Sequence, residues 1–476
     1  MTESAVALLI DFGSTYTKLR AVDLAAVRLL GSGQGPSTVT TDITVGLNAA
    51  LEDLKQRIGR LPDFRHRLAS SSAAGGLRMV TVGLVRELTA EAARQAALGA
   101  GAKLVGTFAY QLTADDITQI LELAPDIVLL AGGTDGGNTE VILANARALA
   151  SAPINCPVVV AGNRVAAADV RELLKTASRP VTVAENVMPE FGVLNIEPAR
   201  AAIRQVFIER IVHAKGMDRA QAIIDQVLMP TPAAVLEGAR LLAEGHGKHS
   251  GLGSLLVVDV GGATTDVHSV CTGKPTHEAV VLQGLPEPYL KRTVEGDLGM
   301  RHNAGSILEA TGLDALAIDA NLPPARVEQI IDTLDEDVER LPASPEERAL
   351  DRALARAAVR LAVQRHAGTT ETVYTVTGSV TVQRGKDLSD VGAVVGTGGP
   401  LAWGVDAGTT LAMALAHPAE PLSLRPRQPR LLLDRDYVLY ACGLLAAVEP
   451  DAALRLALAH CRPAGEETQH GRSSLG

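Results

Sequence analysis

Short apolar runs alternate with segments of helical period along most of the chain, most clearly between residues 61 and 189. The short runs predict buried strands, and the longer amphipathic segments between them predict helices. The predicted order is strand 126–130, helix 139–150, strand 157–161, helix 165–176 and strand 180–184. Because strand, helix and strand in repetition require crossover connections, these residues predict a Rossmann-like unit with a parallel sheet.

Two further regions flank this αβ insert. Residues 196–243 have a mostly helical pattern, and the glycine-rich stretch 244–254 is typical of a boundary loop. The pattern then predicts a strand pair at 255–271, helices within 297–334, and strands at 372–377 and 391–395. Ser344, Pro345 and Glu347 form a capping box that predicts a helix ending near His366.

These patterns divide the chain into four parts. The first half comprises residues 1–60 and 190–245, and the insert comprises 61–189. The second half spans 250–460, and residues 461–476 are expected to form a frayed, flexible tail.

One arrangement of strand, aspartate, turn and strand occurs twice. The stretch LLIDFGSTYTKLRAVD (8–23) is an apolar strand ending at Asp11, a turn of small residues, and a second strand. The stretch LLVVDVGGATTDVHSV (255–270) repeats it without gaps, so that Asp11 aligns with Asp259 and Gly13 with Gly261. A single hairpin of this kind is usually just a tight turn. Two copies, each beginning one half of the chain, indicate a shared function.

The residue types in these hairpins suit phosphate binding. Gly13 and Gly261 allow the backbone to turn tightly and to approach a ligand closely. Hydroxyl groups and turn amides donate to phosphate oxygens, and an aspartate at a strand end can hold a hydrated magnesium ion. The two hairpins together predict a phosphate clamp that uses Mg²⁺.

A third element is the glycine turn in VVGTGGPLAW (394–403). A strand followed by glycines and a helix can lie flat against a base or a ribose. The stretch VTGSV (376–380) is a competing candidate for this role. Neither a Walker A motif nor a complete G-x-G-x-x-G occurs, so a P-loop and a dinucleotide-binding fingerprint are both unsupported.

The hairpin pair resembles that of the superfamily of acetate and sugar kinases, heat-shock chaperones and actin. In that superfamily, two ribonuclease-H-like halves close on ATP from opposite sides. The resemblance implies an α/β fold with two ribonuclease-H-like halves, of the actin and heat-shock ATPase type, and a Rossmann-like αβ insert in the first half. DFGSTYTK (11–18) is similar to the chaperone form of the first motif, and DVGGATTD (259–266) to the second.

The resemblance implies site residues by position. The catalytic candidates are Asp11 and Asp259, and the metal-binding candidates are Asp11, Asp259 and Asp266. The candidates for binding the ATP phosphates are Gly13, Ser14, Thr15, Lys18, Gly261, Gly262, Thr264 and Thr265. The candidates for binding adenosine are Gly396, Thr397, Gly398 and Gly399.

One position departs from the superfamily pattern. Heat-shock chaperones carry N-E-P-T-A-A-A-x-x-x-G before the second hairpin, and its glutamate helps to place the hydrolytic water. The similar stretch here is LMPTPAAVLEG (228–238), with Met229 at the glutamate position and Glu237 farther along the helix. Since a thioether can neither accept a proton nor orient water, a slow ATPase is expected. Alternatively, another acid serves, such as Glu185 or Glu190.

Composition narrows the class of protein. The net charge of −10 argues against a nucleic-acid partner or an anionic membrane surface. The four cysteines form no close pair, which suits a reducing compartment, and no stretch of about 18 apolar residues occurs. The N-terminus lacks the pattern of a signal peptide. We therefore expect a cytoplasmic protein without a membrane segment.

The insert phrases narrow the resemblance further. Together with the hairpins and GTGG, the phrases LLAGGTDGGN (129–138) and VVVAGN (158–163) resemble the MutL-type accessory proteins of adenosylcobalamin-dependent glutamate (methylaspartate) mutase. The turn AGGTDGGN is either an anion nest, with Asp135 and Asn138 as contacts, or a tight turn with Asn138 or Thr139 as the helix N-cap.

This family resemblance implies an ATP-dependent accessory or reactivating chaperone that releases damaged cobalamin from the mutase. ATP and Mg²⁺ are the implied cofactors, the mutase subunits are the implied partners, and a homo-oligomer remains open. The cobalamin ligand motif D-x-H-x-x-G is absent, which fits a protein that acts on the holoenzyme. The alternatives are a small-molecule kinase of the same superfamily and a nucleotide-dependent scaffold.

Overall fold

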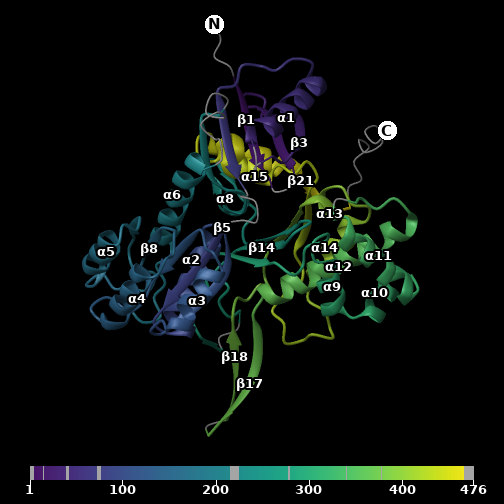
Figure 1. Ribbon diagram of the computed structural model, residues 1–476. Helices are drawn as coiled ribbons and strands as arrows, with labels where there is room; N and C mark the ends of the chain where they lie inside the picture. The colour runs from purple at the N-terminus through teal and green to yellow at the C-terminus, as the bar shows by residue number, and fades with distance from the viewer. Residues whose placement is uncertain are drawn as a thin grey trace. The chain divides into compact units, whose positions relative to one another are not determined.

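The computed structural model describes residues 5–13, 16–38, 42–71, 77–214, 224–276, 279–338, 340–376 and 378–465 (Figure 1). The chain forms two compact units, which we describe separately. Unit 1 comprises Met1–Gly238, Gly284–Lys291 and Tyr440–Ala453. Unit 2 comprises Ala239–Gln283, Arg292–Leu439 and Leu454–Gly476. Among the described residues, no helix combines the length and apolar character needed to cross a membrane.

Unit 1 contains a five-stranded sheet that carries the first hairpin. Its order is β10 (Gln226–Pro230), β4 (His66–Ser71), β1 (Val6–Phe12), β2 (Tyr16–Asp23) and β3 (Arg28–Pro36). β1, β2 and β3 form an antiparallel meander, whereas β4 lies parallel to β1 and β10 parallel to β4. Helix α1 (Ile43–Ile58) packs closely on β3, because a Cβ on Gly33 would lie 2.2 Å from Ala50 O.

The αβ insert of unit 1 has a second five-stranded sheet, and every strand pair in it is parallel. Its strand order is β6 (Ala102–Ala109), β5 (Leu77–Gly83), β7 (Ile127–Leu130), β8 (Val158–Val160) and β9 (Val181–Val183). The helical segments are η1 (Arg86–Ala90), α2 (Glu91–Gly99), α3 (Ala114–Glu122), α4 (Glu140–Ser151) and α5 (Ala167–Thr176). The predicted parallel sheet is thus confirmed. We expected the insert from residue 61, but β4 pairs with β1, so the sheet of the insert begins with β5.

Unit 2 carries the second hairpin in a six-stranded sheet. The order is β16 (Leu290–Glu295), β14 (Thr265–Val270), β13 (Leu255–Val260), β19 (Ala393–Thr397), β20 (Arg430–Asp434) and β21 (Cys461–Pro463). β13 and β14 are antiparallel, whereas β19 lies parallel to β13 and β20 parallel to β19. Read outward from its hairpin, this sheet repeats the strand order of the first sheet of unit 1. The repeated order confirms the two predicted ribonuclease-H-like halves.

Helices cover the sheet of unit 2, and a separate ribbon extends from it (Figure 1). The helices are α9 (Ala304–Thr311), α10 (Leu313–Ala320), α11 (Pro324–Glu336), α12 (Pro345–His366), α13 (Gly399–Ala402) and α14 (Ala407–Ala412). The capping box of α12 is present, since Ser344 Oγ accepts from Glu347 N at 3.1 Å. The ribbon has the order β15 (Val280–Gln283), β18 (Gly378–Arg384) and β17 (Thr369–Thr375). The glycine-rich boundary loop contains β11 (Gly245–His246) and β12 (His249–Ser250).

Three expectations about element boundaries need correction. The segment predicted as mostly helical contains α6 (Glu197–Ala214) and α8 (Thr231–Glu244), but β10 lies between them. The start of the expected tail forms β21, which pairs with β20. Part of the expected second half, Tyr440–Ala453, belongs to unit 1 and includes most of α15 (Leu439–Leu445). Helix α16 (Pro450–His460) has residues in both units.

Candidate functional site

The first hairpin closes on a tight turn after Asp11. Gly13 N donates to Tyr16 O at 3.0 Å, and strand pairing places Asp11 opposite Lys18. A Cβ on Gly13 would lie 2.6 Å from Tyr16 O, so a side chain does not fit at this position. The predicted phosphate contacts Ser14 and Thr15 lie outside the described residues.

Asp11, near the end of β1, is a buried carboxylate that contacts the first residue of helix α8. Its side chain is 2% exposed, and Thr231 Oγ1 donates to Asp11 Oδ1 at 2.6 Å. Thr231 Oγ1 also lies 3.2 Å from Ser70 Oγ on β4. Burial raises the pKa of Asp11, and the Lys18 charge and the hydrogen bond from Thr231 only partly oppose that shift. A cation bound at this carboxylate would therefore stabilise the ionised form of Asp11, which burial disfavours.

The second hairpin repeats the geometry of the first. Gly261 N donates to Thr264 O at 2.9 Å, and strand pairing places Asp259 opposite Asp266. These contacts match those of the first hairpin position by position, which confirms the predicted duplication. Asp266 therefore occupies the position that Lys18 has in the first hairpin.

A loop after β16 holds the turn of the second hairpin from one side. The carbonyl oxygens of residues 261–263 accept from Met300 N at 3.1 Å, Arg301 N at 2.9 Å and Asn303 Nδ2 at 3.0 Å. Gly262 and Ala263 remain exposed to solvent. The carbonyl side of the turn thus faces the protein, and the tip of the turn is accessible.

Asp266 is held by two partners through different oxygens. Arg292 donates to Oδ1 from Nη2 at 2.8 Å and from Nε at 3.1 Å, whereas Thr264 Oγ1 donates to Oδ2 at 3.2 Å. Arg292 could not be identified from the sequence, because it lies 26 residues after Asp266 and no motif connects the two. The neighbouring Thr265 is buried and donates to Leu298 O at 2.7 Å, so its hydroxyl is directed into the protein.

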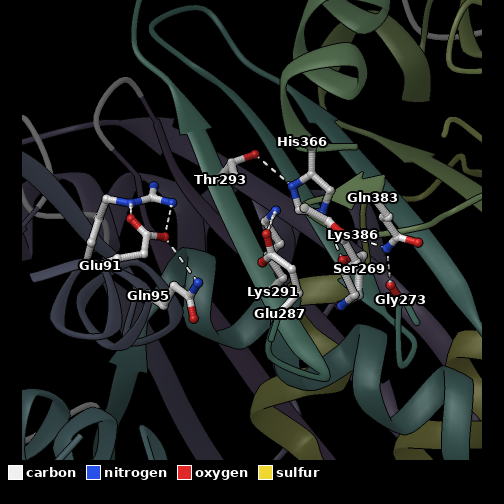
Figure 2. A network of polar contacts seen from close by, with 12 residues as sticks. Glu91, Gln95, Ser269, Gly273, Glu287, Lys291, Thr293, His366, Gln383 and Lys386 are labelled. Carbon is white, nitrogen blue, oxygen red and sulfur yellow. Dashed lines mark hydrogen bonds and ion pairs between the residues drawn. The ribbon is translucent and has the colours of Figure 1, made fainter. Parts of the chain in front are cut away.

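A buried polar chain links His366 to Thr293 and Ser269 (Figure 2). His366 of α12 lies 2.8 Å from Thr293 Oγ1 on β16 through Nδ1 and 2.8 Å from Ser269 Oγ on β14 through Nε2. All three side chains are less than a tenth exposed. These contacts join one helix to two strands beside Asp266.

The glycine turn of the predicted adenosine motif lies directly against the second hairpin. β19 pairs with β13 so that Thr397 is opposite Asp259. Gly398 has a φ of +87°, and a Cβ there would lie 2.6 Å from Asp259 Oδ1 and 2.2 Å from Val260 O. This position therefore requires glycine for both conformation and space. The competing stretch 376–380 lies at the β17–β18 turn in a different sheet, and its Thr377 is outside the described residues.

Asp434 at the end of β20 is a further carboxylate that the sequence analysis missed. It is fully buried, Thr397 Oγ1 donates to its Oδ2 at 3.1 Å, and its oxygens accept from Val438 N and Leu439 N at 2.9 and 3.0 Å. In the sequence, Asp434 resembles Asp11 and Asp259 in that it directly follows an apolar run, LLL. Asp434 fixes Thr397 and the start of α15.

Met229 lies on β10, which has the same place in the first sheet of unit 1 as β20 has in the sheet of unit 2. It pairs with Ser70 on β4, which in turn pairs with Asp11 on β1, and its side chain is 9% exposed. Glu237 lies on α8 and forms an ion pair with Arg204 at 3.3 Å.

The alternative acids lie in the insert region. Glu185 follows β9 and accepts from Asn195 Nδ2 at 3.0 Å, while Glu190 forms an isolated bridge with Val193. Both glutamates thus make their described contacts within the segment that follows β9.

Hydrogen bonds from neighbouring segments hold the turn AGGTDGGN. Asp135 Oδ1 accepts from Asn186 Nδ2 at 2.9 Å and from Arg164 N at 3.0 Å. Asn138 Oδ1 accepts from Val141 N at 3.1 Å, whereas Thr139 makes no side-chain capping bond. These contacts favour the tight turn capped by Asn138 over the anion nest.

The oxygen-only donor set at the second hairpin fits a hydrated magnesium ion. Asp259, Asp266 Oδ2 and the Thr264 hydroxyl supply oxygens, and Mg²⁺ commonly binds through one or two carboxylates while it keeps several waters. Within the described ranges, no group of three His, Cys, Asp or Glu side chains could hold a metal by itself. The arrangement is therefore suited to a metal that arrives with its own waters and with phosphate.

A family model described as MutL protein matches residues 7–461 of this chain. The chain belongs to the MutL family. Protein MutL of Clostridium tetanomorphum is 47% identical over 450 residues, which cover 94% of this chain and 97% of that protein. The matched residues include both hairpins, the insert and the glycine turn.

Solved structures with low sequence identity also align with this chain. Xylulose kinase from Bifidobacterium adolescentis is 13% identical with a TM-score of 0.30, covering 98% of this chain and 95% of the kinase. Plasmodium falciparum glycerol kinase with ADP is 10% identical with a TM-score of 0.36, covering 96% and 92%. Ethanolamine utilization protein EutJ from Carboxydothermus hydrogenoformans is 11% identical with a TM-score of 0.26, covering 94% and 89%. Likenesses this distant do not indicate a function.

Proposed function

We propose that this MutL-family chain is an ATP-dependent accessory protein of an adenosylcobalamin-dependent mutase of the glutamate mutase type, and that it releases damaged cobalamin. The observation that carries the nucleotide part is the duplicated hairpin, with the same turn bond and the same register around Asp11 and Asp259. The mutase part rests on the family resemblance of the insert phrases and the hairpins.

Each motif has a role in binding ATP. Asp11 and Asp259 would hold a hydrated Mg²⁺ ion, which would neutralise phosphate charge. The accessible turn at Gly261 and Gly262, with the Thr264 hydroxyl beside it, receives phosphate oxygens. The glycine turn at Gly398 receives the adenosine part, because it lies against Asp259.

Hydrolysis by this chain is slow. Strand β4 lies between Met229 and Asp11, Met229 cannot orient water, and Glu237 forms an ion pair with Arg204. The chain is therefore a nucleotide-dependent switch rather than a rapid ATPase. ATP has one more phosphate than ADP with which to contact the two hairpins, so the two nucleotides favour different conformations of the chain. Because these conformations differ in their affinity for the mutase, the bound nucleotide changes that affinity.

The test is reactivation of a mutase that holds damaged cofactor. The mutase is inactivated, separated from free cobalamin, and mixed with this chain, Mg²⁺, fresh adenosylcobalamin and either ATP or no nucleotide. Recovered activity is expected with ATP and the native chain, and not with Asp11→Ala. Asp115→Ala is the matched control, because Asp115 is an exposed aspartate on α3.

The alternatives predict other results. A small-molecule kinase would phosphorylate a metabolite while the mutase neither binds nor recovers. A scaffold would bind the mutase equally well with ATP, with ADP and without nucleotide. Recovery of activity without ATP would also overturn the proposal.

A further inference from the structure

The only tryptophan of the chain lies beside the glycine turn of the second unit. Trp403 directly follows α13, whose first residue is Gly399, and its side chain is 60% exposed. A Cβ on Gly399 would lie 3.8 Å from the indole ring, which is van der Waals distance. The indole therefore lies next to the glycine surface that adjoins Asp259.

The indole ring contacts a constrained turn of the protein. The ring centroids of Trp403 and Tyr437 are 6.2 Å apart, with an interplanar angle of 37°. Tyr437 has a φ of +51°, which is uncommon for a non-glycine residue, and its N donates to Asp434 O at 3.2 Å. Arg435 Nη1 donates to Ala402 O at 3.2 Å, on the residue before Trp403. The indole is thus supported by a constrained turn and yet more than half exposed.

This combination suits a planar aromatic ligand. Apolar aromatic surface left in water is unfavourable unless a ligand or partner covers it, and indole rings stack well on flat π-systems. The adjoining glycine turn has no side chains to obstruct such a ligand, and it ends next to the carboxylate of Asp259. A nucleotide is the ligand class that combines an aromatic base with phosphates and a metal.

We propose that Trp403 stacks on the base of the bound nucleotide and makes this site prefer nucleoside triphosphates over inorganic polyphosphate. This inference rests on the proposed function, because it requires that ATP binds at the two hairpins. It assigns base recognition to a side chain outside the glycine turn itself. The neighbouring Val405 is 70% exposed, so a protein partner covering both side chains is the competing explanation.

The test uses the emission of the single tryptophan together with calorimetry. The native chain is titrated with Mg²⁺-ATP and, separately, with Mg²⁺-tripolyphosphate, which has phosphates but no base. ATP should change the Trp403 emission, and tripolyphosphate should bind without a comparable change. Trp403→Leu should weaken ATP binding about tenfold, the range typical of base stacking on an aromatic ring, and leave tripolyphosphate affinity unchanged. Trp403→Phe should retain most of the affinity.

Tyr374→Leu is the matched control, because Tyr374 is 85% exposed at the end of the β17–β18 ribbon and should not affect either ligand. If Trp403→Leu binds ATP as tightly as the native chain, base stacking is wrong and ATP binding stands. That result, with a loss of mutase binding in the same variant, would assign Trp403 to a protein interface. If the native chain binds neither ATP nor tripolyphosphate, the proposed function itself fails.

Discussion

Asp11 is a carboxylate that the fold keeps in an unfavourable environment. Burial raises its pKa above the ordinary value, so the folded chain binds its proton more tightly than the unfolded chain does. The free energy of unfolding therefore falls as pH rises from the ordinary aspartate pKa through the raised one, and above that range the ionised Asp11 costs stability. Retention of such a cost is typical of a functional site.

Asp11→Asn should therefore be at least as stable as the native chain at neutral pH, because the amide carries no charge to desolvate. The advantage in melting temperature should shrink as pH is lowered toward the range in which the native carboxyl is protonated. Mg²⁺-ATP affinity should fall at least tenfold in the same variant, the effect of losing one charged contact. Thermal melts at several pH values and calorimetry provide the measurements.

Asp115→Asn, on the exposed surface of the first turn of α3, should leave ATP affinity unchanged and should lower the melting temperature only slightly, through the helix dipole. A lower melting temperature for Asp11→Asn at neutral pH would show that the charge of Asp11 stabilises the fold and would contradict this assignment.

Met229 sets an expectation for turnover. Because its thioether stands where a water-orienting carboxylate is expected, the purified chain should hydrolyse ATP at well below ~1 s⁻¹, compared with a median enzyme rate of about 10 s⁻¹. Phosphate release by the chain alone, with Asp11→Ala as the blank, is the measurement. A basal rate above ~1 s⁻¹ would mean that another acid activates the water.

The residues that sequence could predict are those that repeat. Asp11 and Asp259 were found because two hairpins align without gaps, and the glycines because turn chemistry is local. Arg292 lies on a separate strand from Asp266, and only the sheet brings them together. Likewise, no sequence pattern indicates that Thr265 directs its hydroxyl to Leu298 rather than outward.

At the scale of elements, the role of the glycine turn after β19 can be tested with an alanine substitution, which adds a single Cβ atom. Gly398→Ala places a Cβ against Asp259 Oδ1 and Val260 O and also strains a positive φ. The clash should cost about 2 kcal/mol or more of unfolding free energy and weaken ATP binding, because the turn must move away from the carboxylate. Denaturant unfolding and calorimetry measure the two effects.

Gly378→Ala separates strain from clash. Gly378 also has a positive φ, of +128°, but a Cβ there would meet nothing within 4 Å. This variant should lose only the strain component, about 1–2 kcal/mol, and keep native ATP affinity. Equal effects of the two substitutions on ATP binding would argue against contact between the glycine turn and the nucleotide site.

Elements defined by local patterns were predicted well, and those defined by distant pairing were not. The capping box located α12, and the apolar runs located the strands of the insert, because both signals lie within a few residues. β10 has only the short sequence QVLMP and owes its form to pairing with β4. β21 is similarly short and pairs with β20. Neither strand has enough alternation of its own to be recognised.

At the scale of the whole molecule, the chain contains two sheets of one design, in two compact units. Each unit supplies one hairpin with an aspartate at the end of its central strand, and unit 2 alone supplies the glycine turn. The proposed function requires that a single Mg²⁺-ATP contacts both hairpins, so that its binding is linked to the conformation of the chain and, through that conformation, to mutase affinity.

Calorimetric titration of Mg²⁺-ATP into the native chain, Asp11→Ala and Asp259→Ala tests this requirement most directly. We expect one ATP per chain, and a loss of affinity of at least tenfold from either substitution, since each removes a charged contact worth more than about 1.4 kcal/mol. Circular dichroism on both variants verifies that the fold is intact. Native affinity in either folded variant, or two independent ATP sites per chain, would contradict a nucleotide held by both hairpins.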